Sequence, residues 1–327
     1  MKNRFQVLDG WRGISILLVL AGHLLPLGPK YWQMNAAVAA TGMAIFFILS
    51  GFLITTILLR NQNIGTFLIR RFMRIIPLAW LVLLAALIFT SSETSLYPPH
   101  LLFYANWKPV SLVPATSHFW SLCVEMQFYA MIALLVLLLK SRAFVTLPVL
   151  CLSVTAFRYF HSVDISIFTQ YRIDEILAGC VLALIYNTNG SILSVISKLS
   201  PLYLCPILIL SAHPLGGFTA YLRPYLALLL IGSTLSAKDD IWWKKWITCS
   251  TLVYIASISY ALYVLHGVLR HTWLGDGATL EKYAKRPLLF AVTFGLAHLS
   301  TFYYEKYFIQ LGKKITSNTG DTSVTTG

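Results

Sequence analysis

Long apolar segments without regular alternation constrain this 327-residue chain more than any other feature of its sequence. Hydrophobic residues make up 57% of the chain and charged residues only 11%, which excludes a water-soluble protein with an ordinary polar surface. Inside a bilayer, backbone amide and carbonyl groups find partners only in helices or closed barrels, and barrel strands alternate polar and apolar residues. The sequence therefore predicts an all-α, polytopic integral membrane protein.

We predict about ten transmembrane helices in a single domain that covers residues 1–311. The predicted spans are 11–28, 37–59, 75–91, 119–139, 144–160, 173–188, 201–213, 219–235, 251–270 and 287–304. The seventh span is the shortest and contains Pro201 and Pro206, which interrupt helical hydrogen bonding. Residues 312–327 are mostly polar and are predicted to form a short disordered cytoplasmic tail.

Positive charges gather in alternate connections between these spans. Clusters occur at Arg60, Arg70, Lys140 and Lys244. Because cationic loops remain in the cytoplasm, both termini are predicted to be cytoplasmic. The net charge of +13 follows from this distribution, so it does not indicate a nucleic-acid partner. The five cysteines lack metal-ligand spacing, and no metal site is expected.

Arg12 and His23 both lie in the first span, within LDGWRGISILLVLAGHL. Their spacing of eleven positions puts them on one face of a helix, about 16 Å apart along its axis. An ionisable group inside a bilayer costs free energy, so it usually has a partner and a function.

Depth along the predicted spans sorts most of the other ionisable residues into two layers. The outer layer holds His23, Glu125, Arg172, Asp174 and His266. We expect Glu125 to contact His23, because a neutral imidazole beside a carboxylate is suited to act as a general base. Three alternatives are a structural ion pair of Glu125 with Arg172, a pair of Arg172 with Asp174, and a purely structural hydrogen bond of His266 to a neighbouring helix.

The inner layer is cationic, and Ser50 of the second span lies toward it. It contains Arg60, Arg70, Arg71 and Arg74. Guanidinium groups bind phosphate through paired hydrogen bonds, so the layer suits a phosphorylated ligand. The alternative to ligand binding is that these arginines only orient the chain in the membrane, because the positive-inside rule places arginines beside the cytoplasmic ends of spans.

These segments resemble the motifs of the acyltransferase family 3 membrane proteins. LDGWRGISILLVLAGH resembles the first family signature, FFILSGFLIT at 46–55 its Ser-Gly-Phe segment, and RRFMRIIPLAW at 70–80 its Arg-x-x-Arg motif. HFWSLCVEMQFY at 118–129, YRIDEILAGCVLAL at 171–184, SISYALYVLHGVL at 257–269 and FYYEKYFIQLGKK at 302–314 resemble later blocks in the same order. The chain departs from the family pattern at Trp11 and Met126.

The resemblance implies an enzyme of a bacterial inner membrane that transfers an acyl group, usually acetyl, from cytoplasmic acyl-CoA to a carbohydrate hydroxyl. Acetyl-CoA is then a donor substrate, and no permanently bound cofactor is expected. The implied acceptors are O-antigen of lipopolysaccharide, enterobacterial common antigen, exopolysaccharide or another lipid-linked or surface glycan. Family members that modify peptidoglycan often carry an added extracytoplasmic domain, which we do not find in this sequence. Membrane lipid and glycan-assembly enzymes are further expected partners.

The resemblance also suggests roles for particular residues. Arg71 and Arg74, with Arg12, are expected to bind the CoA phosphates. His23 is expected either to deprotonate the acceptor hydroxyl or to form a transient acyl-imidazole, and Glu125 to orient it.

The remaining assignments concern the thioester and the acceptor. Ser50 is expected either to donate a hydrogen bond to the thioester carbonyl or to allow close helix packing. Arg172, Asp174, His266 and Trp120 are expected to shape the acceptor site, although the position of Trp120 favours the interfacial aromatic belt. The alternative function is a transporter or flippase for a glycan precursor or a small anion, which would also use ionisable residues in the membrane but would not need CoA.

Overall fold

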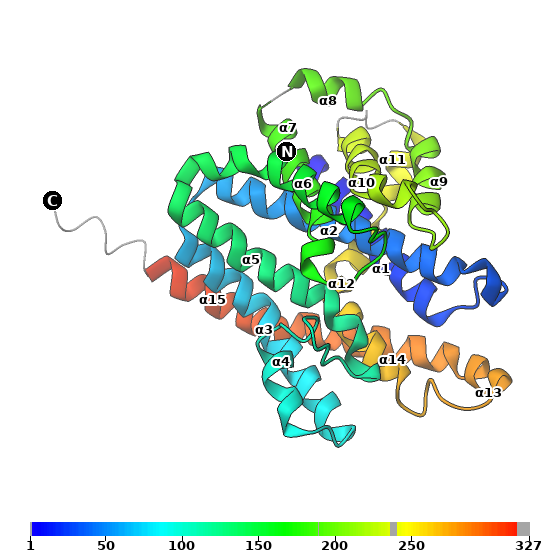
Figure 1. Cartoon of the computed structure of the whole chain (residues 1–327). Coiled ribbons are helices and arrows are strands. Elements are labelled where there is room, and N and C mark those ends of the chain that lie inside the picture. Colours follow the sequence, from blue (N-terminus) through cyan, green and yellow to red (C-terminus); the bar gives the residue numbers. More distant parts are fainter. Residues whose placement is uncertain (1, 189, 236–240, 319–327) are drawn as a thin grey trace.

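The computed structural model describes residues 2–188, 190–235 and 241–318, and within these ranges it contains helices and no β-strand (Figure 1). The longer helices are α1 (Lys2–Leu24), α2 (Met34–Arg60), α3 (Ile64–Phe89), α5 (Trp120–Leu139), α6 (Ala143–Phe160), α7 (Asp174–Thr188), α10 (Thr219–Leu235), α12 (Ser250–Arg270), α14 (Arg286–Leu299) and α15 (Lys306–Asn318). The shorter helices are α4 (Tyr97–Leu101), α8 (Gly190–Ile196), α9 (Pro201–Ser211), α11 (Trp242–Ile247) and α13 (Thr279–Ala284). The predicted all-α class is therefore confirmed.

Five helical stretches are long and apolar enough to cross a membrane. They are Gln6–Leu24, Met34–Arg60, Ile64–Phe89, Pro114–Phe160 and Ser250–Arg270, and α7 with α8 would give a sixth if the two form one bent span. A helix lies on each of the ten predicted ranges, but α9 has only 11 residues and α14 only 14. The polytopic membrane class is confirmed, whereas the number of crossings and the location of the termini stay predictions.

Glycine allows the closest helix contact in the core, between α2 and α7. A Cβ atom built on Gly51 would lie 1.9 Å from the carbonyl oxygen of Ile176, and one built on Gly179 would lie 2.2 Å from that of Ile48. Each helix therefore places its glycine against the backbone of the other, as is typical of small residues in membrane helix interfaces. This contact confirms the predicted close packing beside Ser50.

Helix α3, which carries Arg70, Arg71 and Arg74 of the inner layer, is fixed at several points along its length. Its first turn is capped by Asn63, whose side-chain oxygen accepts a hydrogen bond from the Thr66 amide at 2.9 Å. Further along, the Tyr260 hydroxyl of α12 donates to the carbonyl oxygen of Ile75 at 2.5 Å. The Tyr304 hydroxyl donates to that of Pro77 at 3.3 Å. These contacts place the arginine-bearing turns of α3 against α12 and the C-terminal helices.

The chain remains helical beyond the last predicted span, so the predicted tail is wrong in part. Helix α14 continues through a π-helical segment (Ser300–Glu305) into α15, and Figure 1 shows α14 and α15 in one line, with α15 beside α3. The Arg70 side chain donates to the Thr316 hydroxyl at 2.9 Å. Contact with α3 thus orders residues up to 318, and the tail predicted at 319–327 lies outside the described residues.

Candidate active site

Three histidines from three separate segments lie close together. His23 comes from the last turn of α1, His266 from α12, and His118 from a 3-10 helix (Pro114–Phe119) that precedes α5. The His23 and His266 rings are nearly parallel, with 5.2 Å between centroids and 6° between planes, and the His118 ring centroid lies 4.9 Å from that of His266. His266 is fully buried, whereas His23 is half-buried, so His23 is the accessible member of the pair.

The hydrogen bonds of these rings determine where their protons lie in the neutral state. His266 Nδ1 lies 2.7 Å from the carbonyl oxygen of Tyr263, which can only accept, so Nδ1 carries the proton and Nε2 the lone pair. His23 Nδ1 lies 2.9 Å from His266 Nε2 and must therefore donate to it. His23 Nε2 is left with a lone pair, which is the form that a general base or a nucleophile requires.

The partner of His23 is His266, and the prediction that Glu125 orients His23 is wrong. One carboxylate oxygen of Glu125 accepts hydrogen bonds from the Ser50 hydroxyl at 2.5 Å and from the Tyr129 hydroxyl at 2.6 Å. Counting residues from a span end gives height along a helix but not the direction of the side chain around it. Glu125 points toward α2, which carries Ser50.

Glu125 lines a narrow cavity of about 60 Å³ together with the residues predicted to bind the donor. The polar and charged residues around this cavity are Arg12, Ser50, Arg71, Arg74, Glu125, Tyr129, Ser259 and Tyr260. The structure therefore brings together Arg12, Arg71, Arg74 and Ser50, as the sequence predicts, and adds Glu125 to them. Arg60 does not line this cavity or the two that adjoin it.

Two other cavities share walls with the narrow one. A wider cavity of about 310 Å³ shares both α3 arginines with it. A small cavity of about 10 Å³ shares Arg12 and Ser259 with it and extends to Tyr263. The three cavities form a row that begins at the arginines of α3 and ends at Tyr263, whose carbonyl oxygen accepts a hydrogen bond from His266.

The contacts of Ser50 favour one of its two predicted roles. Its hydroxyl hydrogen is donated to Glu125, so it is not available to a thioester carbonyl in this arrangement. The neighbouring Gly51 makes the close approach to α7 described above. Ser50 thus holds the Glu125 carboxylate in the wall of the narrow cavity, beside the close contact of α2 with α7.

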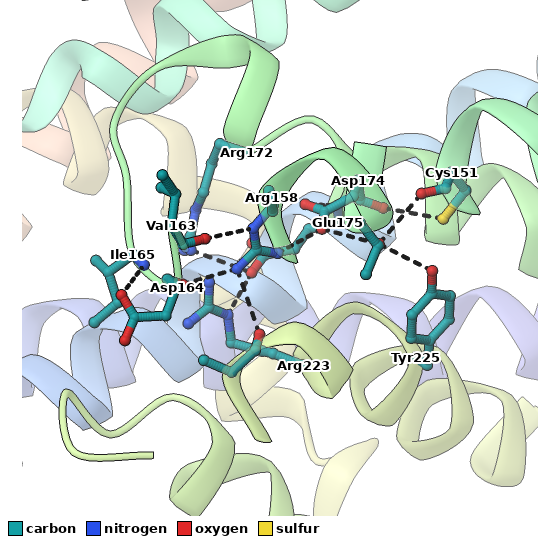
Figure 2. Close-up of polar contacts among 12 residues, drawn as sticks. Cys151, Arg158, Val163, Asp164, Ile165, Arg172, Asp174, Glu175, Arg223 and Tyr225 are labelled. Carbon is teal, nitrogen blue, oxygen red and sulfur yellow. Dashed lines mark hydrogen bonds and ion pairs between the residues drawn. The ribbon is translucent and has the colours of Figure 1, made fainter. Parts of the chain in front are cut away.

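Arg172 and Asp174 belong to a buried ion cluster with partners that the sequence analysis did not identify (Figure 2). Arg158 Nη1 lies 2.5 Å from Asp174 Oδ2, and Arg223 Nε lies 2.5 Å from Glu175 Oε1. Arg172 Nη1 lies 3.3 Å from the same Glu175 oxygen. The predicted pairs of Arg172 with Asp174 and with Glu125 are therefore wrong. Asp174 and Glu175 are consecutive helical residues, so their side chains point about 100° apart, toward different neighbours.

The cluster carries an excess positive charge. Its five side chains are at most 3% exposed, and they comprise three guanidinium groups but only two carboxylates. Among the described residues, both Nη atoms of Arg223 and the Nε of Arg172 have no hydrogen-bond partner. The Arg172 guanidinium instead lies 5.3 Å from the ring centroid of Trp120, a cation–π contact. Trp120 thus supports Arg172, and a role for its ring in binding a sugar stays a prediction.

Sequence reasoning missed several members of these two sites. Arg158 and Arg223 lie inside apolar runs, the same signal that identified Arg12, and Glu175 directly follows a residue that was selected. Tyr129 lies one helical turn beyond Glu125. No comparable signal exists for Tyr263, because its contribution to the histidine pair is a backbone carbonyl.

The chain belongs to the acyltransferase family 3: the family model, described as an acyltransferase domain, matches residues 5–305. It is similar to the protein named "Putative O-acetyltransferase SACOL0978" of Staphylococcus aureus (strain COL), with 26% identity over 83% of this chain and 52% of that protein. It is also similar to "Peptidoglycan O-acetyltransferase OatA" of Listeria monocytogenes, with 26% identity over 79% of this chain and 48% of that protein.

"Putative peptidoglycan O-acetyltransferase YrhL" of Bacillus subtilis (strain 168) is 30% identical over 55% of this chain and 33% of its own length. The chain spans about half the length of the first of these relatives, or less of the others. No solved structure matches it.

Proposed function

We propose that this protein is a membrane O-acetyltransferase that moves an acetyl group from acetyl-CoA to a hydroxyl group of an envelope glycan in a bacterial inner membrane. The observation that carries this proposal is the row of cavities between the α3 arginines and the His23–His266 pair. Membership of an acyltransferase family supports the type of reaction.

The donor enters at the arginine end of the row. Arg71 and Arg74 bind the CoA phosphates, and Arg12 marks the start of the narrower path. The pantetheine arm extends along this path and brings the thioester toward His23. Arg12 and His23 are about 16 Å apart along α1, a separation that an extended, flexible arm can cover.

His23 Nε2 takes the proton of the acceptor hydroxyl, and the acceptor oxygen attacks the thioester carbonyl carbon. The carbon–sulfur bond then breaks, and the CoA thiolate leaves with the proton that His23 received. In the acyl-imidazole alternative, the same Nε2 lone pair attacks the thioester carbonyl carbon first, the carbon–sulfur bond breaks and the CoA thiolate leaves. The acceptor hydroxyl then attacks the acetyl carbon, the carbon–Nε2 bond breaks, and the hydroxyl proton passes to the thiolate. Both routes need Nδ1 protonated, and His266 holds that form through its hydrogen bond. His266 is thus a positioning residue rather than a substrate-binding one.

Peptidoglycan is the first acceptor to test, because the names of two relatives specify it. O-antigen, enterobacterial common antigen and exopolysaccharide are the other acceptors suggested by the sequence motifs. The acceptor site is shaped by the buried ion cluster, to which Arg172 and Asp174 belong, and by Trp120, which contacts Arg172.

The test is transfer of label from acetyl-CoA in membranes that contain the protein, followed by analysis of peptidoglycan and other glycan fractions. We expect His23→Ala to lower transfer at least about 100-fold, the usual contribution of a general base. His161→Ala is a matched control, because His161 is exposed and lies after α6, away from the row of cavities. Retained transfer in His23→Ala contradicts the mechanism. Glycan movement without CoA, and without label, would favour the transporter alternative.

A further inference from the structure

The widest cavity of the row combines positive charge with apolar walls. It lies between the last turn of α2, the first turns of α3 and one side of α15, and has a volume of about 310 Å³. Arg70 and Lys313 line it in addition to the two arginines shared with the narrow cavity, and no carboxylate is among its described lining residues. Ile57, Phe67 and Ile309 supply the apolar walls.

Helix α15 is fixed as a wall of this cavity by specific contacts. Arg70 Nε donates to the Thr316 hydroxyl at 2.9 Å, and that hydroxyl lies 3.0 Å from the Gly312 carbonyl oxygen. A Cβ on Gly312 would lie only 3.0 Å from Met73 Cβ, so glycine allows α15 to approach α3 closely here. These contacts with α3 fix the position of α15 and so place Lys313 in the wall of the cavity.

The adjoining cavity is too small for a nucleotide. Its volume of about 60 Å³ admits a thin chain, whereas the 310 Å³ cavity before it is several times larger. A donor that enters through the row must therefore leave its bulky end in the wider cavity. In CoA that end is an adenosine with a 3′-phosphate, which combines a flat apolar base with a dianion.

We propose that the wider cavity is the subsite for the nucleotide end of the donor, with Lys313 and Arg70 binding the ribose 3′-phosphate and Phe67 contacting the adenine. This inference rests on the proposed function. A phosphate dianion attracts ammonium and guanidinium groups more strongly than a neutral hydroxyl does. Lys313 therefore determines the preference for a 3′-phosphorylated donor, and α15 belongs to the substrate-binding structure.

The test compares two donors, acetyl-CoA and acetyl-dephospho-CoA, which lacks the 3′-phosphate. We expect Lys313→Ala to raise KM for acetyl-CoA roughly tenfold, the loss of one charge-assisted contact, and to leave KM for acetyl-dephospho-CoA unchanged. Lys314→Ala is the matched control, because Lys314 is the adjacent exposed lysine and does not line the cavity. An equal rise in both KM values, or no rise in either, overturns the subsite.

Two further measurements distinguish the nucleotide of the donor from a lipid headgroup as the occupant of this cavity. An anionic lipid headgroup in the cavity would make the effect of Lys313→Ala disappear in vesicles made only of zwitterionic lipid, a result that overturns the assignment to the donor. Equilibrium binding of adenosine 3′,5′-bisphosphate and adenosine 5′-phosphate needs no catalysis. Tighter binding of the bisphosphate that depends on Lys313 would support the subsite even if no acetyl transfer occurred, whereas equal binding of both would overturn it.

Discussion

At the residue scale, the proposed chemistry depends on which nitrogen of His23 carries a proton. A carbonyl oxygen fixes the tautomer of His266, and His266 in turn fixes that of His23. The sequence identified both histidines as ionisable groups in apolar spans, but it could not pair them. They are separated by 243 residues, and each could equally have faced another helix.

His266→Leu should lower kcat about tenfold to 100-fold with little change in KM for acetyl-CoA, because His23 then loses the acceptor that holds its Nδ1–H. His266→Gln should restore much of the activity, since a side-chain amide oxygen can accept the same hydrogen bond. Kinetic measurement of both variants checks this. Equal loss in both would indicate that His266 serves packing alone.

The stability of the buried ion cluster also depends on individual side chains. Asp174→Asn should destabilise the protein by about 3–5 kcal/mol, because Arg158 would remain buried without its carboxylate partner. Adding Arg158→Met should recover part of that loss, since no unpaired charge remains. Thermal unfolding in detergent measures both effects. Additive losses in the double variant would show that the two residues act independently.

At the element scale, the long apolar runs located every longer helix except α15, which begins beyond the last predicted span. The face of this region that packs against its neighbours carries Glu305, Gly312 and Thr316, all buried. A search for apolar residues at helical spacing does not detect a buried face made of small and polar residues. Such a search also does not detect the π-helical segment before α15, because that segment departs from the period of 3.6 residues per turn.

The crossing of α2 and α7 gives a prediction at this scale. Gly51→Ala should destabilise the protein by about 1–3 kcal/mol or more, because the added methyl group would meet the backbone of α7 at 1.9 Å. Gly295→Ala is the matched control, since nothing lies within 4 Å of its Cβ position and alanine is the better helix former. Unfolding temperatures of the two variants should therefore move in opposite directions, and equal values would contradict the close packing.

At the scale of the whole molecule, the row of cavities extends from the arginine-bearing end of α3 to Tyr263, which is hydrogen-bonded to His266. Composition was sufficient to predict the membrane class, and the ionisable residues in apolar runs were sufficient to select most of the site. The grouping of Arg12, Arg71, Arg74 and Ser50 was predicted, but the partners of His23 and Glu125 were not, because they depend on how each helix is rotated about its axis. Glu125 was for that reason assigned to the histidines, although it lines the narrow cavity with Arg12, Arg71 and Arg74.

Blocking this row while leaving both ends intact is the most direct test of the central claim. Ser259 lines both narrower cavities, whereas Ser257 on the same helix is exposed. Labelled acetyl transfer and binding of adenosine 3′,5′-bisphosphate should be measured for Ser259→Phe and for the control Ser257→Phe. We expect Ser259→Phe to lose transfer at least about 100-fold while nucleotide binding persists, since only the path to His23 is filled. Wild-type transfer in Ser259→Phe would contradict passage of the donor through these cavities.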